Sequence, residues 1–152
     1  MSKSGLLAAL LMLGAPAAAI AAGDIAMHRD PGCGCCEKWA AQVRQQFGRR
    51  VAVIDDRQRA AFQAKRGVPQ SLSSCHTAII DGMVFEGHVP IADMKRVLKQ
   101  RPKGVIGLAV AGMPMGSPGM EVPGVRPEAY DVIAFGPGGR QVYARHNDGA
   151  RR

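Results

Sequence analysis

Three of the four cysteines in this 152-residue chain lie within four consecutive positions, as Cys33, Cys35 and Cys36; the fourth is Cys75. A disulfide that closes a very short loop stabilises a fold little, so two structural bridges are not expected here. An apolar core must therefore hold the chain together. A hydrophobic fraction of 47% and a charged fraction of 21% suit a globular protein, and the length suits a single core.

The cysteine cluster lies where the sequence pattern changes from strand to helix. Residues 25–28 predict a short strand, and residues 29–34 form a turn rich in glycine and proline. From Glu37 to Phe47 the apolar residues recur on one helical face, and Gly48 is typical of a helix end. The cysteines are therefore expected at the start of a helix.

The next segments repeat this alternation of strand and helix. Residues 51–54 predict a strand and residues 57–66 a helix. Residues 77–86 predict a hairpin about Asp81-Gly82, and a third helix runs from residue 90 to just before Pro102. This order of elements, with cysteines at the first strand-to-helix turn, is typical of a thioredoxin-like α/β domain. We expect that domain over residues 23–103.

Residues 104–152 add a C-terminal extension to this plan. It contains a loop rich in glycine, proline and methionine at residues 112–124, then two strands at 130–135 and 141–144 across a glycine-rich turn. We expect a β-hairpin there, and we expect the methionine-rich loop to contribute to a metal site.

The first 22 residues have the order of a secretory signal peptide: a short basic start, an apolar run and an Ala-x-Ala pattern. The apolar run is short for a bilayer span, although a retained anchor is the alternative. We expect an exported protein with no membrane segment after cleavage. The net charge is +8, but aromatic residues make up only 5% and the basic residues are scattered, which disfavours nucleic-acid binding.

The cysteine cluster has two chemical interpretations. Thiolates are stabilised at a helix N-terminus, and a thiolate is both a nucleophile and a soft-metal ligand. Cys33 and Cys36 have the Cys-x-x-Cys spacing of a redox pair, which makes them the redox candidates. Cys35 between them complicates a two-thiol exchange and favours a metal cluster.

Two further segments contribute candidate ligands. Cys75-His76 directly precedes the predicted third strand, where a thioredoxin-like plan places the loop that faces the cysteine turn. His76 is either a ligand or an ordinary loop histidine, and His88 either reaches the site or caps the third helix. Four cysteines also match zinc in number, but adjacent Cys35 and Cys36 are not expected to point at one ion.

The methionines of the extension favour copper. Met113, Met115 and Met120 fall within eight residues of a glycine-rich loop, without the spacing of core residues. Packing is the alternative role for these residues. Thioethers are poor ligands for zinc, calcium and magnesium and good ligands for Cu(I).

These motifs together resemble the CopG-type copper-resistance proteins of Gram-negative bacteria, a thioredoxin-like family with a Cys-x-Cys-Cys motif. The resemblance rests on five ordered segments, at residues 31–39, 74–78, 86–90, 112–121 and 130–132. It implies copper in a cysteine-bridged multinuclear cluster and a role in interconverting Cu(I) and Cu(II) during periplasmic copper detoxification. The ligands it implies are the four cysteines, completed by His76, His88 and the loop methionines.

The sequence therefore predicts a periplasmic copper-binding protein of copper resistance, with periplasmic copper efflux components as possible partners. Two alternatives remain open, a thiol–disulfide oxidoreductase and a copper chaperone without redox activity. Whether the protein is a copper-dependent oxidoreductase, and so an enzyme, is left undecided.

Overall fold

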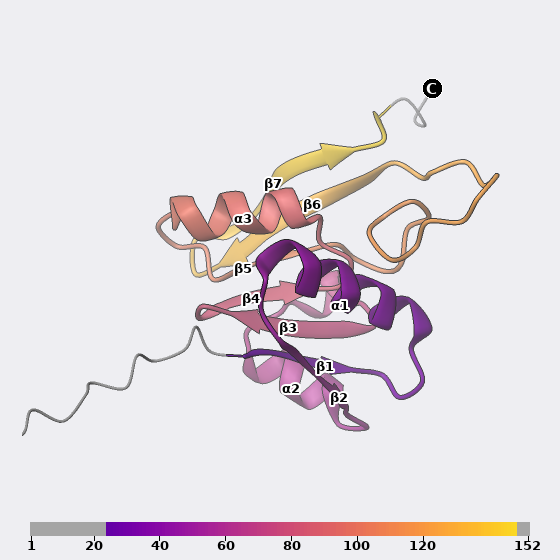
Figure 1. The fold of residues 1–152 in the computed structure, drawn as a ribbon. Helices are drawn as coiled ribbons and strands as arrows, with labels where there is room; N and C mark the ends of the chain where they lie inside the picture. The colour runs from indigo at the N-terminus through magenta and orange to yellow at the C-terminus, as the bar shows by residue number, and fades with distance from the viewer. Residues whose placement is uncertain (1–23, 149–152) are drawn as a thin grey trace, which may run out of the picture.

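The computed structural model describes residues 24–148, which form one mixed sheet of seven strands with three α-helices (Figure 1). The predicted signal peptide, residues 1–22, lies outside the described residues. The strand order is β2-β1-β3-β4-β5-β6-β7. The expected α/β class is therefore confirmed.

The first crossover connects two parallel strands, β1 (Ile25–Arg29) and β2 (Val51–Asp55), through helix α1 (Gly34–Phe47). Helix α1 begins at Gly34, before the apolar period starts, so Cys35 and Cys36 occupy its first turn and Cys33 is its N-cap. It ends at Gly48, whose φ of 63° is left-handed, as the glycine predicts.

The predicted hairpin follows and pairs with β1. Strand β3 (His76–Ile80) is antiparallel to both β1 and β4 (Met83–Glu86). The two turn residues, Asp81 and Gly82, both have positive φ, as a tight hairpin turn requires. Strand β3 begins at His76, which places Cys75 immediately before the sheet.

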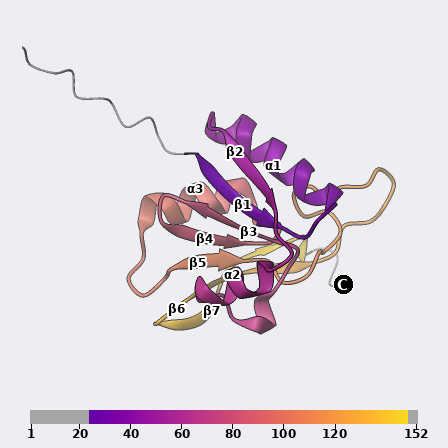
Figure 2. The same cartoon turned by 90° about the horizontal axis from the view of Figure 1, so that it is seen from below.

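Helices cover both faces of the sheet. Helices α1 and α3 (Ile91–Gln100) pack over the main core with Met27, Trp39 and Phe85, while α2 (Arg59–Lys65) lies on the other face (Figure 2). A short 3₁₀ helix, η1 (Gln70–Leu72), places Leu72 in a second core cluster on that face. Apolar side chains thus line both faces of β3 and β4.

The extension continues the same sheet. Strand β5 (Gly107–Ala109) runs parallel to β4, and strands β6 (Tyr130–Gly136) and β7 (Gly139–His146) form the predicted hairpin beside it. Gly107 is required within β5, because a Cβ there would lie 2.7 Å from Cζ of Phe135.

The long loop between β5 and β6 turns back toward the start of α1 (Figure 1). Between residues 24 and 148, no helix has both the length and the apolar character needed to cross a bilayer.

Candidate metal centre

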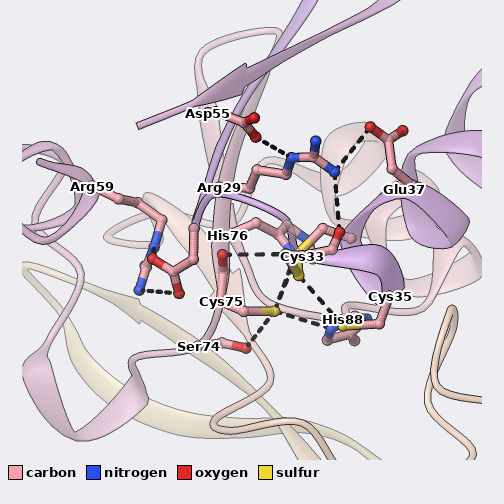
Figure 3. The surroundings of a disulfide bond; sticks show 12 residues. Arg29, Cys33, Cys35, Glu37, Asp55, Arg59, Ser74, Cys75, His76 and His88 are labelled. Atoms are coloured by element: carbon pink, nitrogen blue, oxygen red, sulfur yellow. Dashed lines mark hydrogen bonds and ion pairs between the residues drawn. A yellow bond between two sulfur atoms is a disulfide. The ribbon is translucent and has the colours of Figure 1, made fainter. Parts of the chain in front are cut away.

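Three chain segments meet beside the N-terminus of α1, and each supplies side chains with sulfur or imidazole nitrogen (Figure 3). The first turn of α1 brings three cysteines, the end of the loop before β3 brings Cys75 with His76, and the turn after β4 brings His88. The ligand atoms fall into two overlapping groups that share Cys75. Within each group all atoms lie within 4.8 Å of one another, as Cys33, Cys35, Cys36 and Cys75, and as Cys75, His76 and His88.

The four sulfur atoms form a compact cluster. Cys33 and Cys36 are joined by a disulfide, and Cys35 and Cys75 are free thiols. Each free thiol touches one half of the disulfide: Sγ of Cys35 lies 3.4 Å from Sγ of Cys33, and Sγ of Cys75 lies 3.4 Å from Sγ of Cys36. The sulfur atoms of the adjacent residues Cys35 and Cys36 thus lie within 4.8 Å of each other, so distance alone does not exclude a single ion.

The start of α1 suits anionic sulfur. The unpaired N–H groups and the dipole of its first turn favour negative charge there. Arg29 lies beside the turn, and its Nη1 donates to the carbonyl of Cys33 at 3.0 Å. The carboxylates of Asp55 and Glu37 offset its charge, at 2.6 Å from Nε and 2.9 Å from Nη1. Cys36 is fully buried in the core, whereas Cys33 and Cys35 are partly exposed.

Cys75 is the buried thiol of the group. Burial raises the pKa of Cys75 to about 12, and the neighbouring Cys35 contributes in the same direction. The metal-free site therefore keeps Cys75 protonated at neutral pH. A soft metal that binds this sulfur must displace its proton.

His88 presents a nitrogen lone pair to Cys75. Its Nδ1 donates to the carbonyl of Pro118 at 2.8 Å, and its Nε2 lies 3.2 Å from Sγ of Cys75. Burial lowers the pKa of His88, which keeps the ring neutral. In a neutral ring with a proton on Nδ1, the Nε2 atom is free to accept a thiol proton or bind a metal.

His76 is completely buried between aromatic rings. Its centroid lies 4.5 Å from that of Trp39 and 5.0 Å from that of His88, and its Nδ1 lies 3.6 Å from Sγ of Cys75. Burial holds the pKa of His76 well below its usual value, and the charges of His88 and Arg59 act in the same direction. Within the described part of the chain, Nε2 of His76 has no hydrogen-bond partner, and a buried polar atom without a partner needs an explanation.

The donor set fits a soft metal ion. Sulfur and neutral imidazole are ligands of copper and zinc, and the partnerless Nε2 of His76 agrees with a role in ligation. The disulfide between Cys33 and Cys36 occupies two of the four sulfur atoms. Use of all four as thiolates therefore requires a two-electron reduction of the protein.

The methionine-rich loop covers the site through its backbone. Pro118 accepts the hydrogen bond from His88, and Gly119 packs so closely that a Cβ there would lie 2.6 Å from the carbonyl oxygen of Cys35. Met113 is half exposed, with 51% of its surface accessible, and Met115 and Met120 are partly buried. The ligand atoms that converge thus come from the cysteines and two histidines, with the three methionines on the loop beside them.

Sequence reasoning missed two charged residues that lie behind the cysteines. Arg59 is one of the scattered basic residues, yet it is only 9% exposed, and Glu86 on β4 is fully buried. A charged residue at the end of the apolar strand 83–86 was the one signal for Glu86. Nothing in the local pattern distinguishes Arg59 from its exposed neighbour Arg57.

Comparisons with known proteins agree with this site. Residues 72–120, which include Cys75, both histidines and the methionine-rich loop, match the family described as "Protein of unknown function, DUF411". Two solved structures, described as forms 1 and 2 of copper resistance protein CopG, are 40% identical to this chain with TM-scores of 0.72. The alignments cover 81% of this chain and 96% and 97% of those chains. A comparison with curated proteins finds no match.

Proposed function

Because the chain belongs to the family of the copper resistance protein CopG, we propose that it binds copper at the cysteine site and acts in copper resistance. The observation that carries this proposal is the convergence of four sulfur atoms with two buried, neutral imidazole rings. Thiolate is among the best ligands for Cu(I), and imidazole suits both copper oxidation states. Copper is the cargo or substrate of this site.

Each site residue has a role in this proposal. The thiolates of Cys33, Cys35, Cys36 and Cys75 hold copper, as a cluster of several bridged ions. His76 and His88 complete the site, and Met113, Met115 and Met120 supply further soft donors. Bound copper supplies a one-electron Cu(I)/Cu(II) couple, and we propose that the protein interconverts the two states. Reduction of two Cu(II) ions to Cu(I) would take the two electrons released when the Cys33 and Cys36 thiolates form their disulfide, and the reverse reaction would return them.

The disulfide supports a second candidate function. Cys33 and Cys36 have the spacing of a redox pair and are joined in the structure, with a free thiol in contact with each. A thiol–disulfide oxidoreductase would use this pair: a partner thiolate would attack the partly exposed Cys33, form a mixed disulfide with it and release the buried Cys36 as a thiolate. A copper chaperone without redox activity is the third candidate. It would bind Cu(I) without changing its oxidation state.

We also propose a thioredoxin-like arrangement for the first part of the chain, through residue 103. The order β2-β1-β3-β4, with β1 parallel to β2 and antiparallel to β3, supports it, as does the position of the cysteine turn between β1 and α1. The residues from 104 onward extend the sheet and cover the metal site. A periplasmic location, and efflux components as partners, rest on the leader pattern of residues 1–22.

The test is an anaerobic Cu(I) titration of the reduced protein against a chromophoric chelator, with the ions counted per chain. We expect more than one copper per chain. A Cys35→Ser/Cys75→Ser variant should lose this capacity but keep the Cys33–Cys36 pair. Absence of copper binding by the wild-type protein would refute the proposal, and disulfide reductase activity that survives in the variant would favour the second candidate. A parallel titration with Zn²⁺ tests the other metal that this donor set fits.

A further inference from the structure

Three charged residues outside the ligand set connect the segment that carries Cys33 to the segment that carries Cys75. Asp30 lies between β1 and the cysteine turn, Arg59 begins α2, and Glu86 ends β4. Arg59 donates through Nε and Nη2 to the two carboxylate oxygens of Asp30, at 2.7 and 3.3 Å. Its Nη1 lies 3.6 Å from Oε1 of Glu86, which is an ion pair and not a hydrogen bond, and this buried Nη1 has no hydrogen-bond partner among residues 24–148. We call these three residues the Asp30–Arg59–Glu86 bridge.

One end of the bridge is bonded to both cysteine segments. The carbonyl of Asp30 accepts the N–H of Cys33 at 3.2 Å, and the N–H of Asp30 donates to the carbonyl of Cys75 at 3.0 Å. The backbone of Asp30 therefore connects the turn that carries Cys33 to the strand end that carries Cys75.

The other end holds the residues on both sides of Cys75. Oε1 of Glu86 accepts the N–H of Ser74 at 2.7 Å, and Oε2 accepts the hydroxyl of Thr77 at 2.5 Å. Gln63 of α2 donates to the same carboxylate at 2.6 Å. The backbone N–H of Ser74, before Cys75, and the hydroxyl of Thr77, after His76, thus bind the same buried carboxylate, that of Glu86.

Burial of these charges has no evident benefit for stability. Glu86 is fully buried and Arg59 is 9% exposed, and the desolvation of such groups offsets much of their mutual attraction. Apolar side chains of similar volume would serve a core as well. The hydrogen bonds of Glu86 and Asp30 instead restrict where the attached backbone can lie, and here that backbone carries Cys75.

We propose that the Asp30–Arg59–Glu86 bridge positions Cys75 opposite Cys36, so that the fourth sulfur joins the other three at the metal site. The three residues are positioning residues. The inference rests on the proposed function in so far as the site binds copper, but the positioning of the two thiols is itself testable without metal.

The metal-free test measures how fast Cys36 and Cys75 form a disulfide. A Cys33→Ser/Cys35→Ser background leaves these two cysteines alone, with sulfur atoms that are 3.4 Å apart in the parent structure. Diamide is added, and free thiols are alkylated and counted by mass spectrometry over time. In this background we expect Arg59→Met to slow disulfide formation at least tenfold, on the order expected for loss of a buried orienting network.

A control with the same type of contact lies just before β1 and β2, on the exposed surface. There Arg50 donates to both carboxylate oxygens of Asp24, at 3.0 and 2.7 Å. Arg50→Met should leave the rate unchanged. Because Asp30 is half exposed, Asp30→Asn weakens the bridge with little risk to folding and should slow the reaction in the same direction. All rates are compared at a temperature at which circular dichroism shows each variant to be folded.

The second readout is Cu(I) affinity of the four-cysteine protein. We expect Arg59→Met to weaken it by about 10- to 100-fold, and Arg59→Lys to restore part of the loss. Rates and affinities equal to those of Arg50→Met would overturn the inference. If the wild-type protein binds no Cu(I), the proposed function fails, and the disulfide rates still decide whether the bridge positions Cys75.

Discussion

The thiol of Cys75 lies 3.4 Å from Sγ of Cys36, although 39 residues separate them in the chain. Cys36 is at the same time joined to Cys33 by a disulfide, so the buried thiol of Cys75 contacts a disulfide sulfur. The same four sulfur atoms are therefore able to hold a disulfide or to bind a soft metal ion as thiolates. They cannot do both fully at once, because a disulfide sulfur is a much weaker ligand than a thiolate.

The oxidation state of the protein should control how much copper it binds. The oxidised chain has two free thiols, Cys35 and Cys75, and the reduced chain has four. We expect reduced protein to bind more Cu(I) per chain than oxidised protein, in an anaerobic chelator competition combined with thiol counting. Equal copper stoichiometry in the two states would contradict the assignment of Cys33 and Cys36 as ligands.

His88 should act through Nε2, and two substitutions separate its two nitrogen atoms. The amide of His88→Asn is placed like Nδ1, so it keeps the hydrogen bond to Pro118 but has no atom near Cys75. We expect it to lower Cu(I) affinity by roughly tenfold or more. His88→Gln carries its amide at the position of Nε2 and should retain more affinity through its oxygen. The reverse order would show that His88 serves only to hold the loop.

Closure of the methionine-rich loop over the site can be tested at two glycines. Gly112 and Gly119 both have positive φ, so an alanine at either position should destabilise the fold by about 1–2 kcal/mol. Only at position 119 would the new Cβ collide, with the carbonyl of Cys35 and the N–H nitrogen of Trp39. We expect Gly119→Ala to weaken copper binding and Gly112→Ala to leave it unchanged. Equal affinities in the two variants would show that the loop does not need to close here.

The thioethers of the loop should contribute to copper affinity. Replacement of Met113, Met115 and Met120 together by leucine preserves apolar volume and removes three soft donors. We expect weaker Cu(I) binding by chelator competition, with an unchanged thermal midpoint of the copper-free protein. Unchanged copper affinity would remove the methionines from the ligand set. A Met83→Leu substitution in the core is the control, since Met83 lies on β4 in the main cluster.

The copper-free protein should lose stability as the pH falls through about 6.5, the usual pKa of histidine. Burial lowers the pKa of both His76 and His88, so at a pH near 6.5 the unfolded chain binds more protons at these two histidines than the folded chain does. The loss falls mainly between about pH 7.5 and about pH 5.5, and each histidine contributes at most about 1.4 kcal/mol per pH unit. Burial raises the pKa of Glu86, which opposes this trend at lower pH, nearer its usual range.

Urea unfolding of the metal-free protein at several pH values measures this effect. A His88→Gln variant should show a smaller loss of stability on acidification than the wild-type protein. The same loss in both proteins would mean that His88 titrates normally in the folded state.

Much of the architecture was predictable, because each element has a local signature. The period of the apolar residues in α1, Gly48 at its end and the Asp81-Gly82 turn all predicted what the structure contains. The boundaries were less exact, since α1 begins at Gly34 and α2 spans only Arg59–Lys65. Helix ends depend on capping and on tertiary contacts as well as on apolar period.

The sequence by itself determined the order of the elements and the position of three cysteines at a helix start, because those features depend on neighbours along the chain. Only the tertiary structure decided which distant groups meet them. The antiparallel register of β1 and β3 brings Cys75 to Cys36, and the loop after β5 brings the carbonyl of Pro118 to His88. The burial of Arg59 and Glu86 near the cysteines was likewise not predictable from the sequence. Such contacts follow from strand pairing and loop closure between residues far apart, which local periodicity does not specify.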